Sequence, residues 1–125
     1  IPATTANTNR DGTGTIVTIA SGPAVAAASG VGKRISRVTV QRTATTTATN
    51  ILFFYSPDGG TTNRFLCEVF LSAYTAGATT VSSEVLVPQL SGFIIPGAAS
   101  NQPCIRATST VSTSAINVTI EGGLL

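Results

Sequence analysis

The sequence has no histidine, no tryptophan and no methionine, and it has only two cysteines, Cys67 and Cys104. Histidine and cysteine supply most zinc ligands, so the usual zinc sites are excluded. Histidine is also the most common general base, and none is present to activate a nucleophile. The two cysteines allow at most one disulfide, and we expect them to be small buried thiols instead.

Residues for catalysis are equally scarce. The five carboxylates lie in expected strands, a turn and the N-terminal segment, without the paired spacing that a two-carboxylate hydrolase needs; they are Asp11, Asp58, Glu68, Glu84 and Glu121. The run GVGKR at 30–34 lacks the Ser or Thr that follows the lysine of a phosphate-binding loop, and it precedes a strand rather than a helix. We therefore expect no enzymatic activity, no metal and no cofactor.

Charge is also sparse. Charged residues make up only 10% of the chain, whereas a typical soluble domain has about 25%. Small neutral residues must cover the surface instead, which favours close packing against protein neighbours over a free soluble β domain with a threonine-rich face. The net charge of +2 is too small to indicate nucleic acid. No stretch reaches the 18 apolar residues of a membrane helix, so we expect no membrane span.

The residues that are plentiful favour strands. Threonine is the commonest residue, valine and isoleucine are frequent, and Gly, Pro, Asn and Asp interrupt the chain at short intervals. Apolar and β-branched runs between these turn residues predict strands at 14–20, 34–43, 50–56, 64–73, 79–88, 92–97, 103–109 and 114–123. About eight short strands with near-zero helix predict an all-β fold, a two-sheet β-sandwich of jelly-roll type.

The length of 125 residues indicates one domain. Residues 1–12 are polar and lack an apolar period, so they are expected to form an extended N-terminal arm ahead of a single sandwich over 13–125, in which 21–32 is a loop. The most apolar run, 50–56, is expected to be a central strand.

Two details of strand geometry can be read from the periodicity. Ile35 is out of phase with the other apolar residues of its strand, which indicates a β-bulge. In the strand at 64–73, strict alternation would place four side chains on one face: Phe65, Cys67, Val69 and Leu71.

The stretch YSPDGGTTNRF at 55–65 allows two interpretations. Its Ser56-x-Asp58-x-Gly60-x-Thr62 pattern fits most of the Asp-box consensus of sialidase-like propellers, which would suggest sugar binding. However, the pattern occurs once, and Asn63 stands where that consensus ends in an aromatic residue. Pro, Asp and Gly also form turns for their own physical reasons. We therefore favour a hairpin turn.

Four of the seven basic residues lie within ten positions of one expected strand. They are Lys33, Arg34, Arg37 and Arg42. One interpretation is a solvated edge strand that charge protects from aggregation; the other is contact with an acidic protein partner. Nucleic acid is disfavoured because no aromatic residue interleaves with these charges. In a regular strand Arg34 and Arg42 would share one face, and Lys33 and Arg37 the other.

The opening NTNRDGTGTIVTIASG and the block GKRISRVTVQRTATTTATNILFFYSPDGGTTNRFLCEV together resemble small head proteins of tailed bacteriophages. Residues 9–69 carry the resemblance, which is to the capsid decoration, or cement, proteins. It implies a non-catalytic protein of the virion that binds the outer capsid surface and stabilises the shell. The implied partners are the major capsid protein and neighbouring copies of this chain, as a trimer or a dimer.

Within that interpretation, residues 1–12 are the expected arm that adds a strand to a neighbour. The residues expected to contact the capsid are Arg10, Lys33, Arg34, Arg37 and Arg42. Two alternatives remain: a carbohydrate-binding β-sandwich module, and a head–tail connector or fibre component. A sugar-binding module would need exposed aromatic residues on one face, and most of the few aromatics here lie in apolar runs that a core requires.

Overall fold

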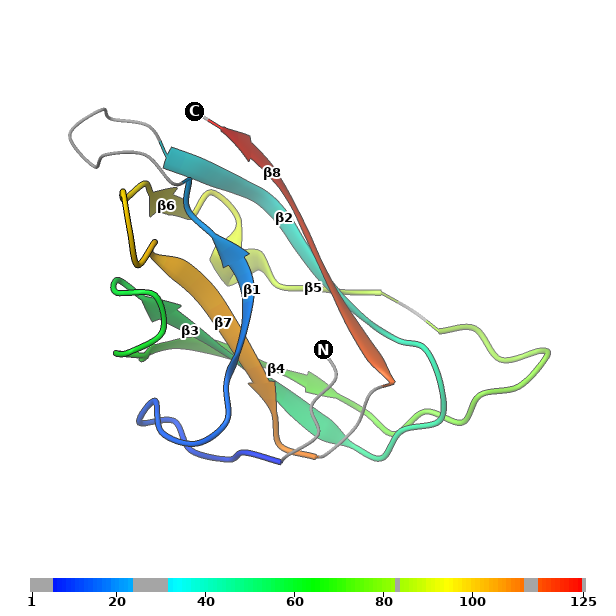
Figure 1. Cartoon of the computed structure of the whole chain (residues 1–125). Coiled ribbons are helices and arrows are strands. Elements are labelled where there is room, and N and C mark those ends of the chain that lie inside the picture. Colours follow the sequence, from blue (N-terminus) through cyan, green and yellow to red (C-terminus); the bar gives the residue numbers. More distant parts are fainter. Residues whose placement is uncertain (1–5, 24–31, 83, 112–114, 125) are drawn as a thin grey trace.

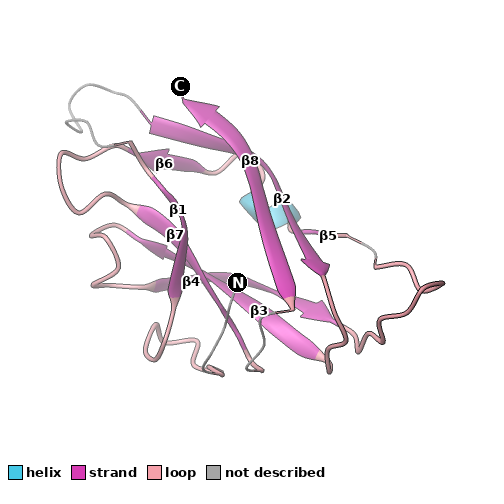
Figure 2. Ribbon diagram, turned by 45° about the vertical axis from the view of Figure 1, so that its right-hand side comes forward, coloured by secondary structure: helices cyan, strands magenta, loops and turns pink. Residues whose placement is uncertain are grey.

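The structure, a computed structural model, describes residues 6–23, 32–82, 84–111 and 115–124, which form two layers of antiparallel strands (Figures 1 and 2). The first sheet has the order β1 (Val17–Ser21), β7 (Cys104–Ser109), β3 (Thr49–Ser56), β4 (Arg64–Leu71). The second sheet is built on β2 (Gly32–Arg42), which pairs with β5 (Val85–Leu86), β6 (Ile94–Pro96) and β8 (Ile116–Leu124). The predicted β-sandwich of about eight short strands is confirmed.

The strand β2 is at the centre of the second sheet. Strand β8 pairs with it from Lys33 to Arg42, so β8 occupies one whole edge. The short strands β5 and β6 pair with two separate parts of β2 and therefore share its other edge. Between β5 and β6 the chain forms a single 3-10 turn, η2 (Pro88–Leu90). Among the described residues no helix is long and apolar enough to cross a membrane.

The core lies between the sheets and is filled by alternate residues of the central strands. Val38 and Val40 of β2 face Ile51 and Phe53 of β3, and each of these side chains is at most 1% exposed. Strand β3 is flanked by β7 and β4, as the apolar run predicted. Its other face is apolar too, because Leu52 and Phe54 form a second, smaller buried cluster with Ile16.

β-Bulges change which side chains share a face. The expected bulge in β2 is present, between Ile35 and Arg37. A second irregularity, opposite Phe53 and Phe54, interrupts β4. The predicted common face of Phe65 and Cys67 is therefore wrong: Cys67 lies in the core, whereas Phe65 packs edge-on against the Phe54 ring, with 5.8 Å between ring centroids.

The predicted strand at 79–88 is wrong in extent, since of its described residues only Val85–Leu86 form a strand. Over much of this segment, side-chain hydrogen bonds connect it to β2 in place of a backbone ladder. Gln41 donates to the Ser82 carbonyl at 2.9 Å, and the Ser82 hydroxyl donates to the Arg42 carbonyl. The first strand begins at Val17, after a positive-φ glycine at 14. Most of the predicted loop at 21–32 lies outside the described residues.

The described part of the predicted arm packs onto its own domain. The backbone N–H of Asn7 donates to the Ser109 carbonyl at 3.0 Å. The Asn7 side-chain amide, in a residue that is 5% exposed, donates to the carbonyls of Thr13 and Thr15. A side chain at Gly14 would place its Cβ 2.6 Å from the Asn7 amide nitrogen, so glycine is needed there. Residues 1–5 of the predicted arm lie outside the described residues.

Candidate functional site

The five basic residues expected to contact a partner do not form one patch. Four follow β2, where Lys33 and Arg42 lie nine residues, or about 30 Å, apart. Arg10 belongs to the N-terminal segment that packs on the first sheet. The interpretation of the basic run as an edge strand is wrong, because β2 has partner strands along both edges.

Two of the five residues form ion pairs within the chain. Arg10 binds Glu68 through two hydrogen bonds, of 2.6 and 3.1 Å, and Glu68 also accepts one from Asn50 at 3.1 Å. The bond from Arg10 lowers the pKa of the Glu68 carboxyl below its ordinary value. Arg37 pairs with Glu84 at 3.0 Å, with both side chains about half exposed. These two arginines are already neutralised by their own chain.

The bulge in β2 also changes the predicted faces of the remaining cations. Ile35 and Val38 are both buried although they are three residues apart. Arg34 and Arg37, each one residue earlier, therefore share the outer face of β2. Arg42, two residues after the buried Val40, follows the inner face, so the prediction that Arg34 and Arg42 share a face is wrong. Arg42 donates to Ser72 at the end of the first sheet, and its guanidinium lies 5.2 Å from the ring centroid of Tyr74.

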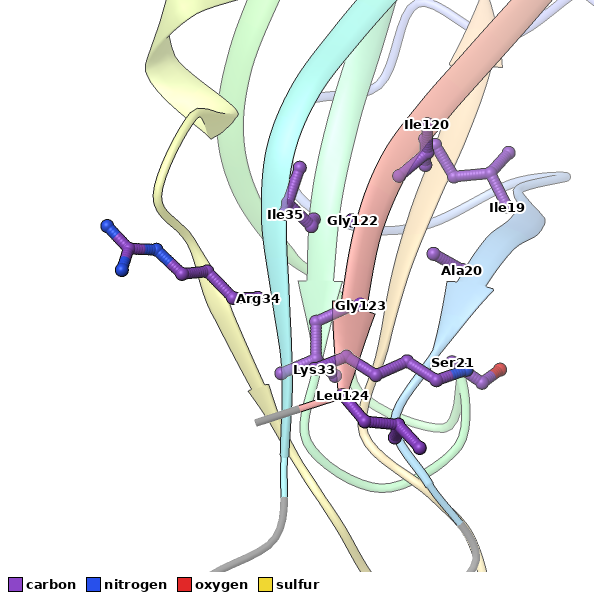
Figure 3. A pocket seen from close by; sticks show the side chains of 11 residues that line it. Ile19, Ala20, Ser21, Lys33, Arg34, Ile35, Ile120, Gly122, Gly123 and Leu124 are labelled. Carbon is purple, nitrogen blue, oxygen red and sulfur yellow. The ribbon is translucent and has the colours of Figure 1, made fainter.

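Lys33 lies in a groove between β8 and β1 (Figure 3). The groove has a volume of about 480 Å³ and draws its walls from β1, β2, β6 and β8. Its lining residues are Ile19, Ala20, Ser21, Lys33, Arg34, Ile35, Ile95, Ile120, Gly122, Gly123 and Leu124. Figure 3 shows the Lys33 side chain reaching across the groove towards Ser21, whereas the Arg34 side chain points away on the opposite side of β2. Arg34 is exposed and Lys33 is partly buried.

The turn between β3 and β4 uses its polar groups to close itself. The buried Ser56 hydroxyl accepts the Gly60 N–H at 2.7 Å and donates to the Asp58 carboxylate at 2.9 Å. The same carboxylate oxygen accepts the Thr62 N–H at 2.8 Å, and this bond lowers the pKa of Asp58. The motif residues thus have a structural task that accounts for their spacing, and the predicted hairpin turn is confirmed.

Sequence reasoning missed the most highly connected polar side chain of this region, Arg106 of β7. Its guanidinium donates to the carbonyls of Ile16 and Gly60, to the Asn63 side chain at 2.9 Å and to the Thr18 hydroxyl at 3.2 Å. It thereby joins the first strand to the β3–β4 turn. No local sequence pattern indicates this role of Arg106, because a single arginine within a predicted strand is ordinarily an exposed charge.

The described residues contain no group of three His, Cys, Asp or Glu side chains that could hold a metal ion. Cys67 and Cys104 are free and buried, as predicted. They belong to β4 and β7, which are separated by β3, so the sheet itself holds them apart. Burial raises the pKa of the Cys67 thiol, which makes its reactive thiolate scarcer at neutral pH.

Comparison with known protein families, with curated proteins and with solved structures finds no match to this chain.

Proposed function

We propose that this chain is a non-catalytic structural protein that binds the outer surface of a bacteriophage capsid and stabilises the shell. Its partners would be the major capsid protein and neighbouring copies of itself. The resemblance of residues 9–69 to capsid decoration proteins supports the proposal. The arrangement of apolar side chains on the sandwich supports it independently.

The observation that carries the proposal is where the large exposed apolar side chains lie. Those of the described residues are Phe65 and Phe70 on β4, Leu86 on β5, Ile94 on β6, Leu124 on β8, and Val81. Only Val81 lies outside a strand, and every strand that carries the others is at the edge of its sheet. Edge strands offer unpaired backbone groups to another chain, so apolar side chains beside them favour protein association.

The electrostatics of the surface agree with such a role. Charged residues are only 10% of the chain, and Arg10 and Arg37 are paired internally with carboxylates. A surface of threonine, serine, alanine and glycine can be covered by neighbouring subunits without removing many ions from water. In a closed symmetric assembly every copy uses the same surface patches, so this property is repeated at each contact.

Quantitative mass spectrometry of purified virions tests the proposal, by comparing copies of this chain with copies of the major capsid protein. A copy number of the same order as that of the capsid protein is the expected result, because a decoration protein occupies a regular lattice. A few copies per particle would assign the chain to the connector or fibre. Absence from virions would refute a structural role and favour the carbohydrate-binding alternative, for which a glycan array is the direct assay.

A further inference from the structure

The longest edge strand of the sandwich, β8, has unpaired backbone groups along the groove. Two residues of β2, Ile35 and Val38, direct backbone groups away from β8. Ile35 donates its N–H to a carbonyl just ahead of β6 and accepts an N–H from the same segment, and the Val38 carbonyl accepts the N–H of Val87, just after β5. Residues directly opposite them on β8 are Gly122 and Ile120. In an antiparallel ladder these residues must point their N–H and C=O groups away from β2.

The same alternation extends along β8. The Ala115 carbonyl accepts the N–H of Thr43, just beyond the end of β2. The residues on the β8 side that bond to β2 are therefore the odd-numbered ones. Val118, Ile120 and Gly122 therefore direct their backbone groups to the free edge. Beyond its own ladder, the described structure gives no hydrogen bond to these backbone groups. In Figure 3 this edge of β8 faces β1 across the groove.

The other sheet edges are less suited to pairing. Strand β4 is interrupted by its bulge, β1 has five residues with a register shift, and β5 and β6 have two and three residues. Bulges and short length are the usual means by which proteins protect an edge from other strands. By contrast, β8 has nine residues, and the bulge in its ladder belongs to β2.

The chemistry of the groove specifies what could lie against β8. Its walls include the apolar side chains of Ile19, Ile95 and Ile120, which would accept alternate side chains of an added strand. The Lys33 side chain is partly buried among them, and no hydrogen bond or ion pair joins its ammonium group to another described residue. A cation in apolar surroundings favours a carboxylate from the occupant.

We propose that the groove between β8 and β1 binds an extended segment of the shell subunit, which pairs with the free edge of β8. Apolar side chains of that segment fill the space between Ile19 and Ile120, and a carboxylate on it meets Lys33. This inference deepens the proposed function and rests on it for the identity of the partner. Strand addition of this kind draws affinity from backbone hydrogen bonds and specificity from the pockets for alternate side chains.

The test is co-sedimentation of the full chain with expanded shells that lack it. Lys33→Glu should weaken binding about tenfold or more, because it places like charges together in the groove. Arg64→Glu makes the same change of charge at an exposed arginine of β4, outside the groove lining, and should alter binding by less than about threefold. Lys33→Gln should weaken binding by an intermediate factor, and it keeps the test valid if the reversed charge impairs folding.

Hydrogen exchange on the free and shell-bound chain gives a second readout. The peptide covering 116–124 should become protected on the shell, since the outward amides of β8 gain acceptors. If the chain binds shells but that peptide stays unprotected and the Lys33→Glu and Arg64→Glu variants bind equally, the groove is not the binding site, and the decoration function stands. If the unaltered chain does not bind shells, the decoration function fails, and the partner inferred here fails with it.

Discussion

Replacing Arg106 by lysine should destabilise the fold while keeping the charge. The guanidinium donates four hydrogen bonds in different directions, two of them to backbone carbonyls, those of Ile16 and Gly60. A lysine ammonium is a single point charge, so we expect it to keep one or two of these contacts. Each lost bond costs about 1 kcal/mol net, so Arg106→Lys should cost about 2 to 3 kcal/mol.

Urea denaturation measures this loss. A single domain of this size has an m value of about 2 kcal/mol per molar urea, so the midpoint should fall by about 1 M. The matched control is Arg34→Lys, the same substitution at an exposed arginine, which should change stability by no more than about 0.5 kcal/mol.

The position of the defect is also predicted. Arg106 joins β1 to the β3–β4 turn, so hydrogen exchange in Arg106→Lys should accelerate first at 12–18 and 56–63 rather than in β2 or β8. A loss below about 0.5 kcal/mol, equal to that of the control, would refute the reasoning, because the four contacts would then be replaceable by water at no cost.

Three further predictions follow from single contacts. Gly122→Ala should destabilise the chain by more than about 1 kcal/mol in urea, since its Cβ would lie 2.2 Å from a carbonyl oxygen of β2, whereas Gly123→Ala, which meets open space, should be nearly neutral. Asp58 has a lowered pKa in the folded chain, so its contribution to stability is present above the unfolded pKa of about 3.9 and is lost as the pH falls through the folded value. Asp58→Asn should therefore flatten that part of the acid denaturation profile. An unchanged profile would contradict the stabilising role given to this carboxylate. Cys67 and Cys104 should react with a thiol reagent only after unfolding, and rapid labelling of the native chain would show that they are not buried.

The sequence was sufficient to predict what depends on local pattern. Alternating β-branched residues and regular turn residues predicted the strands, and the one out-of-phase residue, Ile35, predicted the bulge in β2. The bulge in β4 was missed because Phe65, Leu66 and Cys67 are all apolar, so the periodicity there fits either register. The order of strands, which puts the basic strand at the centre of its sheet, depends on long-range packing that no local pattern records.

The candidate site was only partly predictable for the same reason. The sequence identified Lys33 among the cations, yet its neighbours in the groove come from 19–21, 95, 120 and 122–124, far apart in the chain. Residues 1–12, which include Asn7, were predicted to be an extended arm because this polar run has no apolar period. The buried hydrogen bonds of Asn7 depend on the carbonyls of residues 13, 15 and 109, whose approach only the fold determines.

The distribution of charge bears on how such a chain could associate. Removing an ion from water costs several kcal/mol unless a partner compensates it, whereas covering a hydroxyl side chain costs less than covering an ion, and a short side chain has little rotamer freedom to lose. Arg10 and Arg37 already have carboxylate partners on this chain, so covering them requires no counter-charge from a neighbour. Lys33 differs, because it stands in the groove without a partner among the described residues. A neighbour that covers Lys33 must bring a negative group. This requirement would make the surface select partners that carry such a group, although the rest of it could be covered by many proteins.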